Sequence, residues 1–200
     1  KSEPFLRISM LFCKYFFMNL TIEETEIPEV KLIKQFKASD LRGEFVKPFH
    51  ANDLKSQGID FQMRESFYSI SKKDVIRGMH FHAPPFEHEK IVFCTQGAIM
   101  DVALDLRNNA STYGKYVSRC LSQENGLALL IPKGFAHGFC TLSEQSTTFY
   151  FISGEYEAKA DGGVLFSSFG FDWNISNPIL SDRDKQFASL NDFISPFNSQ

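Results

Sequence analysis

The sequence has few cysteines, a single tryptophan and no excess of basic charge. Only four of its 200 residues are cysteine, and no two form a Cys-x-x-Cys pair. Cys94, Cys120 and Cys140 lie in or beside apolar runs, so we expect small buried side chains in a reducing cytoplasm rather than a disulfide framework. The formal net charge of −3 provides no basic surface, which argues against nucleic acid as a partner.

Long hydrophobic runs are also missing. The apolar stretch at residues 11–17 is interrupted by Lys14 and is too short to cross a bilayer, so we expect no membrane association. No small-residue cleavage site follows it, which disfavours a signal peptide. We interpret residues 1–17 as a non-native or disordered extension, and residues 18–200 as a single domain.

Apolar and β-favouring residues are abundant: 43% of the chain is hydrophobic, and 22 residues are phenylalanine. Turn signals separate many short apolar runs, with no long helix between them, which predicts a mainly β protein built as an antiparallel jelly-roll barrel with a few short helices. Strands are predicted at Val30–Phe36, Glu44–Phe49, Phe61–Ile70, Val75–Phe81, Lys90–Gln96, Ala98–Leu106, Tyr116–Leu121, Leu127–Ile131, Phe139–Leu142 and Thr147–Ile152. Short helices are predicted at Ala51–Gln57 and Asp184–Phe193.

Histidines on two of these segments allow a metal site. His80 and His82 share one strand face, and His137 ends the run Pro-Lys-Gly-Phe-Ala-His. Together with Glu87 they resemble the metal-binding cupin pattern, which suits Fe, Mn, Ni or Zn. The match is incomplete, because Thr141 stands where that pattern has an asparagine.

Proton transfer is the alternative chemistry for the same segments. A histidine in an apolar cavity can act as a general base near neutral pH. Tyr150 lies among apolar strand neighbours and could serve as an acid on the opposite wall. Lys90 begins a strand shortly after His80, where its ammonium could stabilise a developing enolate. The residues alone leave both alternatives open.

A series of ordered motifs then identifies a family resemblance. They are Arg77-Gly78-Met79-His80-Phe81, the run from Gly97 to Arg107, Ser111-Thr112-Tyr113-Gly114, Leu121-Ser122-x-Glu124-Asn125, Ile131-Pro132-x-Gly134-Phe135-Ala136-His137-Gly138-Phe139, Leu142-Ser143-Glu144, Phe171-Asp172-Trp173 and Leu180-Ser181-x-Arg183-Asp184. From about Met18 to about Asp184, the chain resembles the dTDP-4-dehydrorhamnose 3,5-epimerase family.

The resemblance implies a cupin-type jelly roll, a homodimer and a reaction that uses no metal or other cofactor. Its substrate would be a nucleotide-linked 4-keto-6-deoxyhexose, epimerised at C3 and C5 through an enolate. By position, His80 resembles the base and Asp184 its carboxylate partner. Tyr150 resembles the acid on the opposite face, and Lys90 the enolate-stabilising cation. A non-catalytic binding module would have no need of this base–acid pair.

The resemblance also implies a set of substrate-binding residues. Arg42 and Arg77 would meet the diphosphate, because guanidinium groups match phosphate oxygens. His137 and Arg183 would line the sugar-diphosphate site. Tyr156 resembles an aromatic residue that stacks on the nucleotide base, and Asp161 stands near a glutamate of the family.

Several positions depart from the family pattern. His82 replaces a glutamine, which keeps the metal alternative open, and Lys47 replaces a glutamate. Glu65-Ser66-Phe67 stands where the family often has Gln-x-Asn, and we expect Glu65 to contact the substrate. These changes leave a second hypothesis, a 3-epimerase or ketoisomerase acting on another nucleotide-linked 4-keto sugar.

Overall fold

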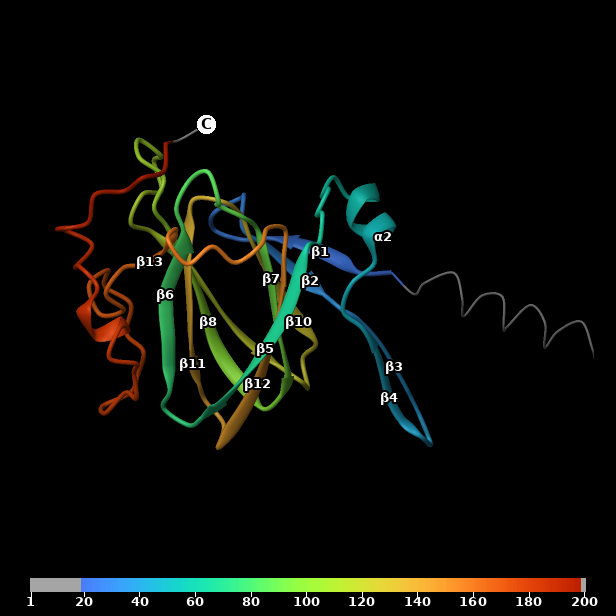
Figure 1. Ribbon diagram of the computed structural model, residues 1–200. Helices are drawn as coiled ribbons and strands as arrows, with labels where there is room; N and C mark the ends of the chain where they lie inside the picture. The colour runs from blue at the N-terminus through green and yellow to red at the C-terminus, as the bar shows by residue number, and fades with distance from the viewer. Residues whose placement is uncertain (1–18, 199–200) are drawn as a thin grey trace, which may run out of the picture.

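The computed structural model describes residues 19–198, and the expectation for residues 1–17 lies outside that range. Two antiparallel sheets face each other (Figure 1). The first contains, in spatial order, β1 (Thr21–Glu24), β2 (Lys31–Lys34), β10 (Leu127–Ile131), β7 (Lys90–Gln96), β12 (Gln145–Ile152) and β5 (Glu65–Lys72). The second contains β13 (Asp161–Gly163), β6 (Ile76–His82), β11 (Phe135–Thr141), β8 (Ala98–Asp105) and β9 (Tyr116–Ser122). The predicted jelly roll is confirmed.

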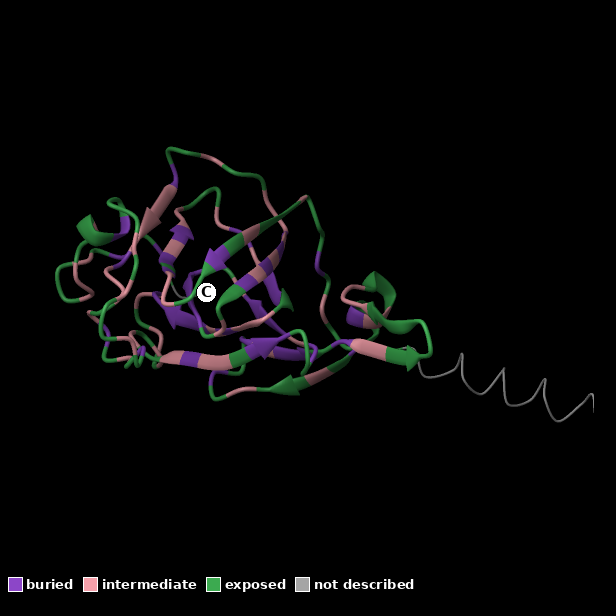
Figure 2. Cartoon of the chain, turned by 90° about the horizontal axis from the view of Figure 1, so that it is seen from below, coloured by how far each residue is buried: buried purple, intermediate pink, exposed green. Residues whose placement is uncertain are grey.

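The inner faces of the sheets enclose one apolar cluster. Leu129, Ile131 and Ile152 from the six-stranded sheet meet Val117 and Phe139 from the five-stranded sheet. Figure 2 shows the buried residues concentrated in the strands of both sheets. This alternation of inward apolar side chains is what the period-two pattern of the sequence predicts.

Each sheet is also covered on its outer face. The segment after β13, drawn in orange and red in Figure 1, packs Val164, Trp173 and Phe197 against the five-stranded sheet. The short helix α2 (Ala51–Ser56) contributes Leu54 to a cluster with Ile33 on the six-stranded sheet. No helix within residues 19–198 is long and apolar enough to span a membrane.

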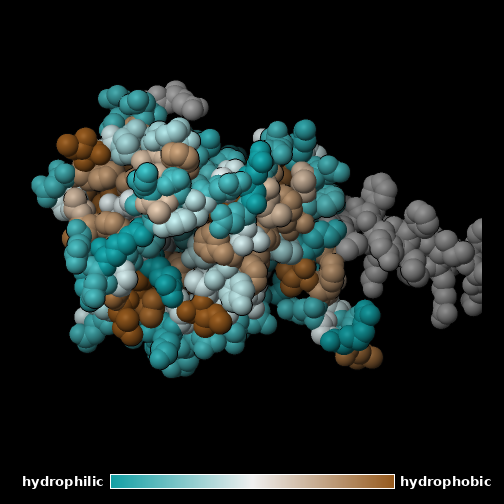
Figure 3. Space-filling model, viewed as in Figure 1, coloured by the Kyte–Doolittle hydropathy of each residue, from teal (hydrophilic) through white to brown (hydrophobic). Residues whose placement is uncertain are grey.

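A hairpin of β3 (Phe36–Asp40) and β4 (Gly43–Lys47) projects away from both sheets (Figure 1). Its exposed side chains include Leu41 at the tip and Phe45 and Val46 on β4. Figure 3 shows the end of this hairpin at the lower right of the molecule, where a small hydrophobic group lies among hydrophilic residues. These apolar side chains remain exposed within residues 19–198.

Most predicted strands lie within a few residues of the observed ones, but the C-terminal helix prediction is wrong. Only a 3-10 turn, η1 (Asp184–Gln186), forms in that segment. The backbone instead bonds to a neighbouring loop: Leu165 donates its N–H to the carbonyl of Ala188, and Leu190 donates to the Ser168 hydroxyl. These tertiary hydrogen bonds replace those that a helix would make internally.

Other differences concern strand ends. The predicted strand Val30–Phe36 is split, because the N–H of Gln35 bonds to Gly126 and Phe36 opens the hairpin. The predicted strand at Phe61 begins only at Glu65, because Phe61 packs in the cluster beside α2. The strand predicted at Phe139–Leu142 begins at Phe135, and the sequence does not predict β1, β3 or β13.

Candidate active site

His80 and His137 meet on the inner face of the five-stranded sheet. They are direct cross-strand partners on β6 and β11. His137 shares its strand face with the core residues Phe135 and Phe139, which fixes that face as the inner one. His82 follows His80 by two residues and therefore lies on the same side.

His80 is held by Asp184. The His80 Nε2 lies 2.9 Å from Asp184 Oδ1, and the other carboxylate oxygen accepts the Gly78 N–H at 3.3 Å. Ser181 Oγ accepts the N–H of Asp184 at 3.1 Å, which fixes the turn that carries the carboxylate. Burial opposes ionisation of Asp184, but the hydrogen bond and charge of His80 outweigh it and lower the pKa of the carboxyl.

This geometry sets the working nitrogen of His80. Because the ionised Asp184 can only accept, Nε2 carries the proton and donates it. Nδ1 is then the nitrogen with a free lone pair. A partly exposed imidazole with one nitrogen fixed by a buried carboxylate is suited to act as a general base.

His137 is bound to a different carboxylate, Asp101 of β8. Its Nε2 lies 2.6 Å from Asp101 Oδ1, and both side chains are buried. Burial lowers the pKa of His137 and outweighs the opposing pull of Asp101, so the ring favours the neutral form. The sequence places Asp101 in the run from Gly97 to Arg107 but does not predict it as a site residue. The sequence indicates it by a charged side chain within the otherwise apolar strand Ala98–Asp105, because a buried charge requires a buried partner.

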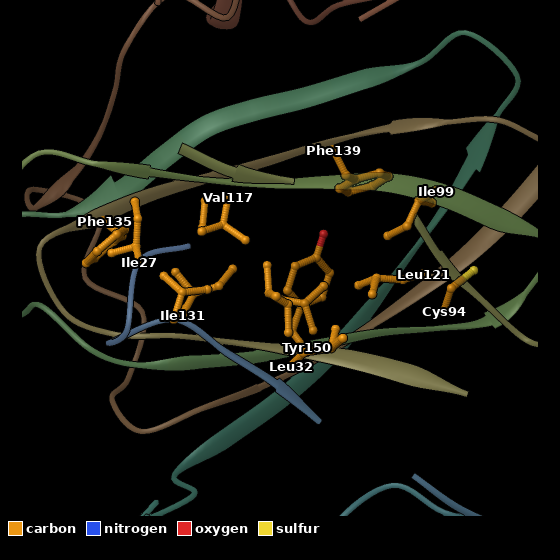
Figure 4. Close-up of a cluster of buried hydrophobic side chains, with 14 of the residues drawn as sticks. Ile27, Leu32, Cys94, Ile99, Val117, Leu121, Ile131, Phe135, Phe139 and Tyr150 are labelled. Carbon is orange, nitrogen blue, oxygen red and sulfur yellow. The ribbon is translucent and has the colours of Figure 1, made fainter. Parts of the chain in front are cut away.

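Tyr150 lies on the opposite wall, on β12 of the six-stranded sheet. Figure 4 shows its ring inside the core cluster, with the hydroxyl directed toward the five-stranded sheet. The ring meets that of His137 edge-on at a centroid distance of 5.8 Å. Burial, with a smaller contribution from the charge of Asp101, raises the pKa of Tyr150, so the phenol keeps its proton.

Lys90 supplies a cation beside His80. Its Nζ donates to the backbone carbonyl of His80 at 3.4 Å. Burial of the ammonium lowers its pKa to about 8, while the carboxylates of Asp161 and Asp101 oppose the shift. A desolvated cation next to a base can stabilise an enolate more strongly than one in water.

Four of the predicted binding residues form one connected group. Asp161 accepts two hydrogen bonds from Arg183, at 2.6 and 2.8 Å, and one from the Tyr156 hydroxyl at 3.3 Å. Glu65 accepts the backbone N–H of Tyr156 at 3.1 Å, which ties β5 to the same group. Arg77 is separate: its Nε donates to Ser71 Oγ at 3.0 Å, and its guanidinium remains exposed.

A pocket of about 380 Å³ adjoins Tyr156. It is lined by Arg64, Pro85, Phe86, Glu87, Ser153, Gly154, Glu155, Tyr156 and Glu157. Tyr156 is mostly exposed, so one face of its ring is available for stacking.

The structure does not bring Arg42 to this group. It lies at the tip of the β3–β4 hairpin, where its guanidinium pairs with Asp40. Because the hairpin projects away from both sheets, Arg42 does not reach the inner faces of its own chain (Figure 1).

The residues of the metal alternative have separate surroundings. His80 and His137 each use one nitrogen on their own carboxylate, whereas the His82 ring packs against His88 at a centroid distance of 4.6 Å. Within residues 19–198, no group of three or more His, Cys, Asp or Glu side chains is arranged to hold a metal ion.

The fold and these inner faces define a jelly-roll protein equipped for acid–base chemistry. The family model described as dTDP-4-dehydrorhamnose 3,5-epimerase matches residues 24–192. The enzyme of that name from Shigella flexneri is 35% identical over 181 residues, which are 88% of this chain and 100% of that protein. That from Sinorhizobium fredii is 38% identical over 172 residues, covering 84% and 88% of the two chains. The chain therefore belongs to the dTDP-4-dehydrorhamnose 3,5-epimerase family.

Two further similarities bear on the substrate. A crystal structure of dTDP-6-deoxy-D-glucose-3,5-epimerase from Legionella pneumophila, in complex with dTDP-4-keto-L-rhamnose, matches with a TM-score of 0.87 at 30% identity. The match covers 91% of this chain and 100% of that one. A dTDP-4-dehydrorhamnose 3-epimerase from Streptomyces niveus is 33% identical over 155 residues, 76% of this chain and 75% of that protein.

Proposed function

We propose that this protein converts dTDP-4-dehydro-6-deoxyglucose to dTDP-4-dehydrorhamnose by inverting C3 and C5. The observation that carries the proposal is the Asp184-bound His80 on one inner face, with the protonated Tyr150 on the facing sheet. An inversion needs a base on one side of the sugar and an acid on the other. Family membership supports the substrate class.

The residues divide the chemistry as follows. The 4-keto group acidifies the hydrogens on C3 and C5. His80 Nδ1 takes one of these protons, and the C–H electron pair passes into an enolate that the Lys90 ammonium stabilises. Tyr150 then donates its proton to the opposite face of the same carbon and recovers one from solvent. Asp184 keeps His80 in the correct tautomer and offsets the charge that the imidazole acquires.

Substrate binding involves the surrounding polar residues. Arg77 presents an exposed guanidinium to the diphosphate. Tyr156 stacks on the base beside its pocket, and the Asp161–Arg183 pair lies between that pocket and His80. His137 lines the sugar side through its position opposite His80.

The test is NMR of freshly generated dTDP-4-keto-6-deoxyglucose with EDTA-treated enzyme in D₂O. We expect deuterium at both C3 and C5, together with the rhamno-configured product. The His80→Asn variant, which keeps a polar side chain of similar size, should exchange neither position. Retained exchange in that variant, or a requirement for added metal, would contradict the assignment of His80.

A second candidate is a 3-epimerase on the same or another nucleotide-linked 4-keto sugar. The similarity to the Streptomyces niveus 3-epimerase and the presence of Phe67 in the substrate-facing strand favour it. Deuterium at C3 alone would establish this candidate. The same experiment with a GDP-linked 4-keto sugar separates a change of nucleotide from a change of reaction.

We also propose a homodimer in which the β3–β4 hairpin carries Arg42 into the site of the partner subunit. The exposed Leu41, Phe45 and Val46 give the hairpin an apolar surface that a second copy would cover. Mixing the variants Arg42→Ala and His80→Asn tests this directly. If Arg42 acts on the partner's site, each mixed dimer regains one intact site, and activity returns. If Arg42 acts within its own chain, mixing restores nothing, and if Arg42 has no role, the Arg42→Ala variant keeps full activity by itself.

A cytoplasmic location belongs to the same proposal. Cys94, Cys120 and Cys140 are all unpaired, which suits a reducing compartment. Fractionation of cells that produce the protein would test it, and a location across the membrane would contradict it.

A further inference from the structure

Phe67 and Tyr150 form a parallel aromatic stack between the edge strand β5 and its neighbour β12. The two residues are direct cross-strand partners, so their side chains project from the same face of the sheet. Their ring centroids lie 4.6 Å apart, and the ring planes differ by 20°. Because Tyr150 belongs to the core cluster, this shared face is the inner one.

Phe67 is the exposed member of the pair. Its relative accessibility is 44%, whereas that of Tyr150 is 7%. Phe67 therefore lies between the Tyr150 ring and solvent on one flat side. His137 contacts Tyr150 edge-on from the facing sheet. The Tyr150 ring is thus confined by an imidazole from one sheet and by a stacked phenyl ring from its own.

The direction of the phenol is critical for an acid that must act on one face of a sugar. A tyrosine ring reorients about two side-chain torsions, and a parallel neighbour restricts both. Phe67 also covers a flat side of the Tyr150 ring, which is itself buried, so little water reaches that ring. Water near the enolate would compete with Tyr150 as the proton donor.

We propose that Phe67 is a positioning residue that holds the Tyr150 phenol in line with the enolate and so decides whether proton return inverts the carbon. The proposal rests on the assignment of Tyr150 as the acid. Phe67 itself exchanges no proton. Phe67 influences whether His80 or Tyr150 returns a proton to the enolate, and it has no part in the removal of the first proton.

The enolate can be protonated on either face, and deuterium labelling distinguishes the two resulting sugars. After His80 takes the proton, the imidazolium exchanges it for a deuteron from D₂O. Return of that deuteron by His80 regenerates the starting sugar with deuterium and without inversion. Donation by Tyr150 on the other face instead gives the inverted sugar. The initial ratio of deuterated starting sugar to inverted product therefore measures how well Tyr150 competes.

The experiment compares this ratio in the wild type and in Phe67→Ala. We expect the variant to raise the ratio about threefold to tenfold, the size of an aromatic pair interaction. Phe67→Tyr keeps a ring in the stack and should restore the ratio to within about twofold of the wild-type value. A purely structural loss would slow both outcomes together and leave the ratio unchanged.

Tyr68→Ala provides a matched control. Tyr68 is the next residue of β5, is also exposed, and stacks on Phe149 of β12 at a centroid distance of 5.1 Å and an angle of 22°. That stack lies on the opposite face of the sheet, so its loss should leave the ratio as in the wild type. An unchanged ratio in Phe67→Ala, or an equal rise in Tyr68→Ala, would overturn the proposal.

A second measurement separates this proposal from the proposed function. NMR of protein labelled with ¹³C on the tyrosine rings reports the flipping of Tyr150 without any substrate, and Tyr150→Phe assigns its signal. We expect Phe67→Ala to speed the flipping about threefold to tenfold relative to both the wild type and Tyr68→Ala, the size of the same pair interaction. If the wild type does not act on the dTDP sugar, the function is wrong, and this ring measurement alone decides whether Phe67 confines Tyr150. Equal flipping in all three proteins would refute the confinement.

Discussion

His80 and His137 lie directly opposite each other on neighbouring strands, yet each imidazole binds a different carboxylate. Asp184 reaches His80 from a turn late in the chain, whereas Asp101 reaches His137 from the adjacent strand β8. His80 is partly exposed and His137 is buried. The two pairs therefore have the same chemical composition but different access to a substrate.

This difference predicts unequal effects of removing the two carboxylates. Asp184→Asn should lower the rate of C3 and C5 exchange by about 100-fold or more, because Nε2 loses the acceptor that fixes the His80 tautomer. Asp101→Asn, the matched change at the buried pair, should cost much less. Initial exchange rates in D₂O measure both. Equal losses of exchange rate would show that the two histidine–carboxylate pairs contribute equally to the reaction.

The lowered pKa of Lys90 predicts that enzymatic activity falls at alkaline pH. Burial lowers the pKa of this amine to about 8, so its positive charge is present below that pH and is lost as the pH rises through it. The value of kcat/KM should therefore decline above about pH 8. Tyr150 does not cause this fall, because its pKa is raised and the phenol stays protonated.

The matched variant for this prediction is Lys90→Arg. A guanidinium keeps its charge throughout the range, so the alkaline fall should disappear even if the overall rate is lower. Profiles of kcat/KM between pH 6 and pH 10 provide the comparison. An identical fall in the variant would assign the titration to another group.

The lowered pKa of His88 predicts that the folded protein loses stability at acidic pH. Burial, followed by the charges of Lys90 and His82, lowers its pKa to about 4. Between the unfolded value near 6.5 and about pH 4, the unfolded chain binds the proton and the folded chain does not. The free energy of unfolding should therefore decrease as the pH falls through this window, with no further contribution from His88 below it.

Urea unfolding at pH 7 and pH 5 measures this loss, and His88→Gln removes the titrating group. We expect a smaller difference between the two pH values in the variant. If the wild type and the variant lose stability equally, His88 is not the group responsible.

The close packing around Gly78 predicts a steric effect two residues from His80. The Gly78 φ of +134° is one that side-chain-bearing residues rarely adopt, and an added Cβ would lie 2.5 Å from Gly138 Cα and 2.9 Å from the His137 carbonyl oxygen. Gly78→Ala should lower the free energy of unfolding by about 2–4 kcal/mol. The control is Gly43→Ala at a φ of +120°, where no atom lies within 4 Å of the added carbon. The loss of unfolding free energy in Gly43→Ala should be clearly smaller. Equal losses in the two variants would mean that backbone strain alone, and not the close contacts at Gly78, destabilises the protein.

The sequence predicts the barrel well, because period-two alternation and turn residues act locally. Strands Lys90–Gln96 and Leu127–Ile131 were predicted with the ends that the structure has. The contact between His80 and Asp184 spans 104 positions, and no local pattern indicates it. It was expected only through the family resemblance. The failed helix at Asp184–Phe193 has the same origin, because tertiary hydrogen bonds decide that segment.

The position of Asp184 has a consequence for synthesis. The carboxylate lies in the segment that packs onto the five-stranded sheet after β13, and this packing extends to Phe197. The ribosome synthesises the strands that bear His80, Lys90, His137 and Tyr150 before this segment. Until the segment docks, His80 lacks its carboxylate partner, which is the state that Asp184→Asn reproduces.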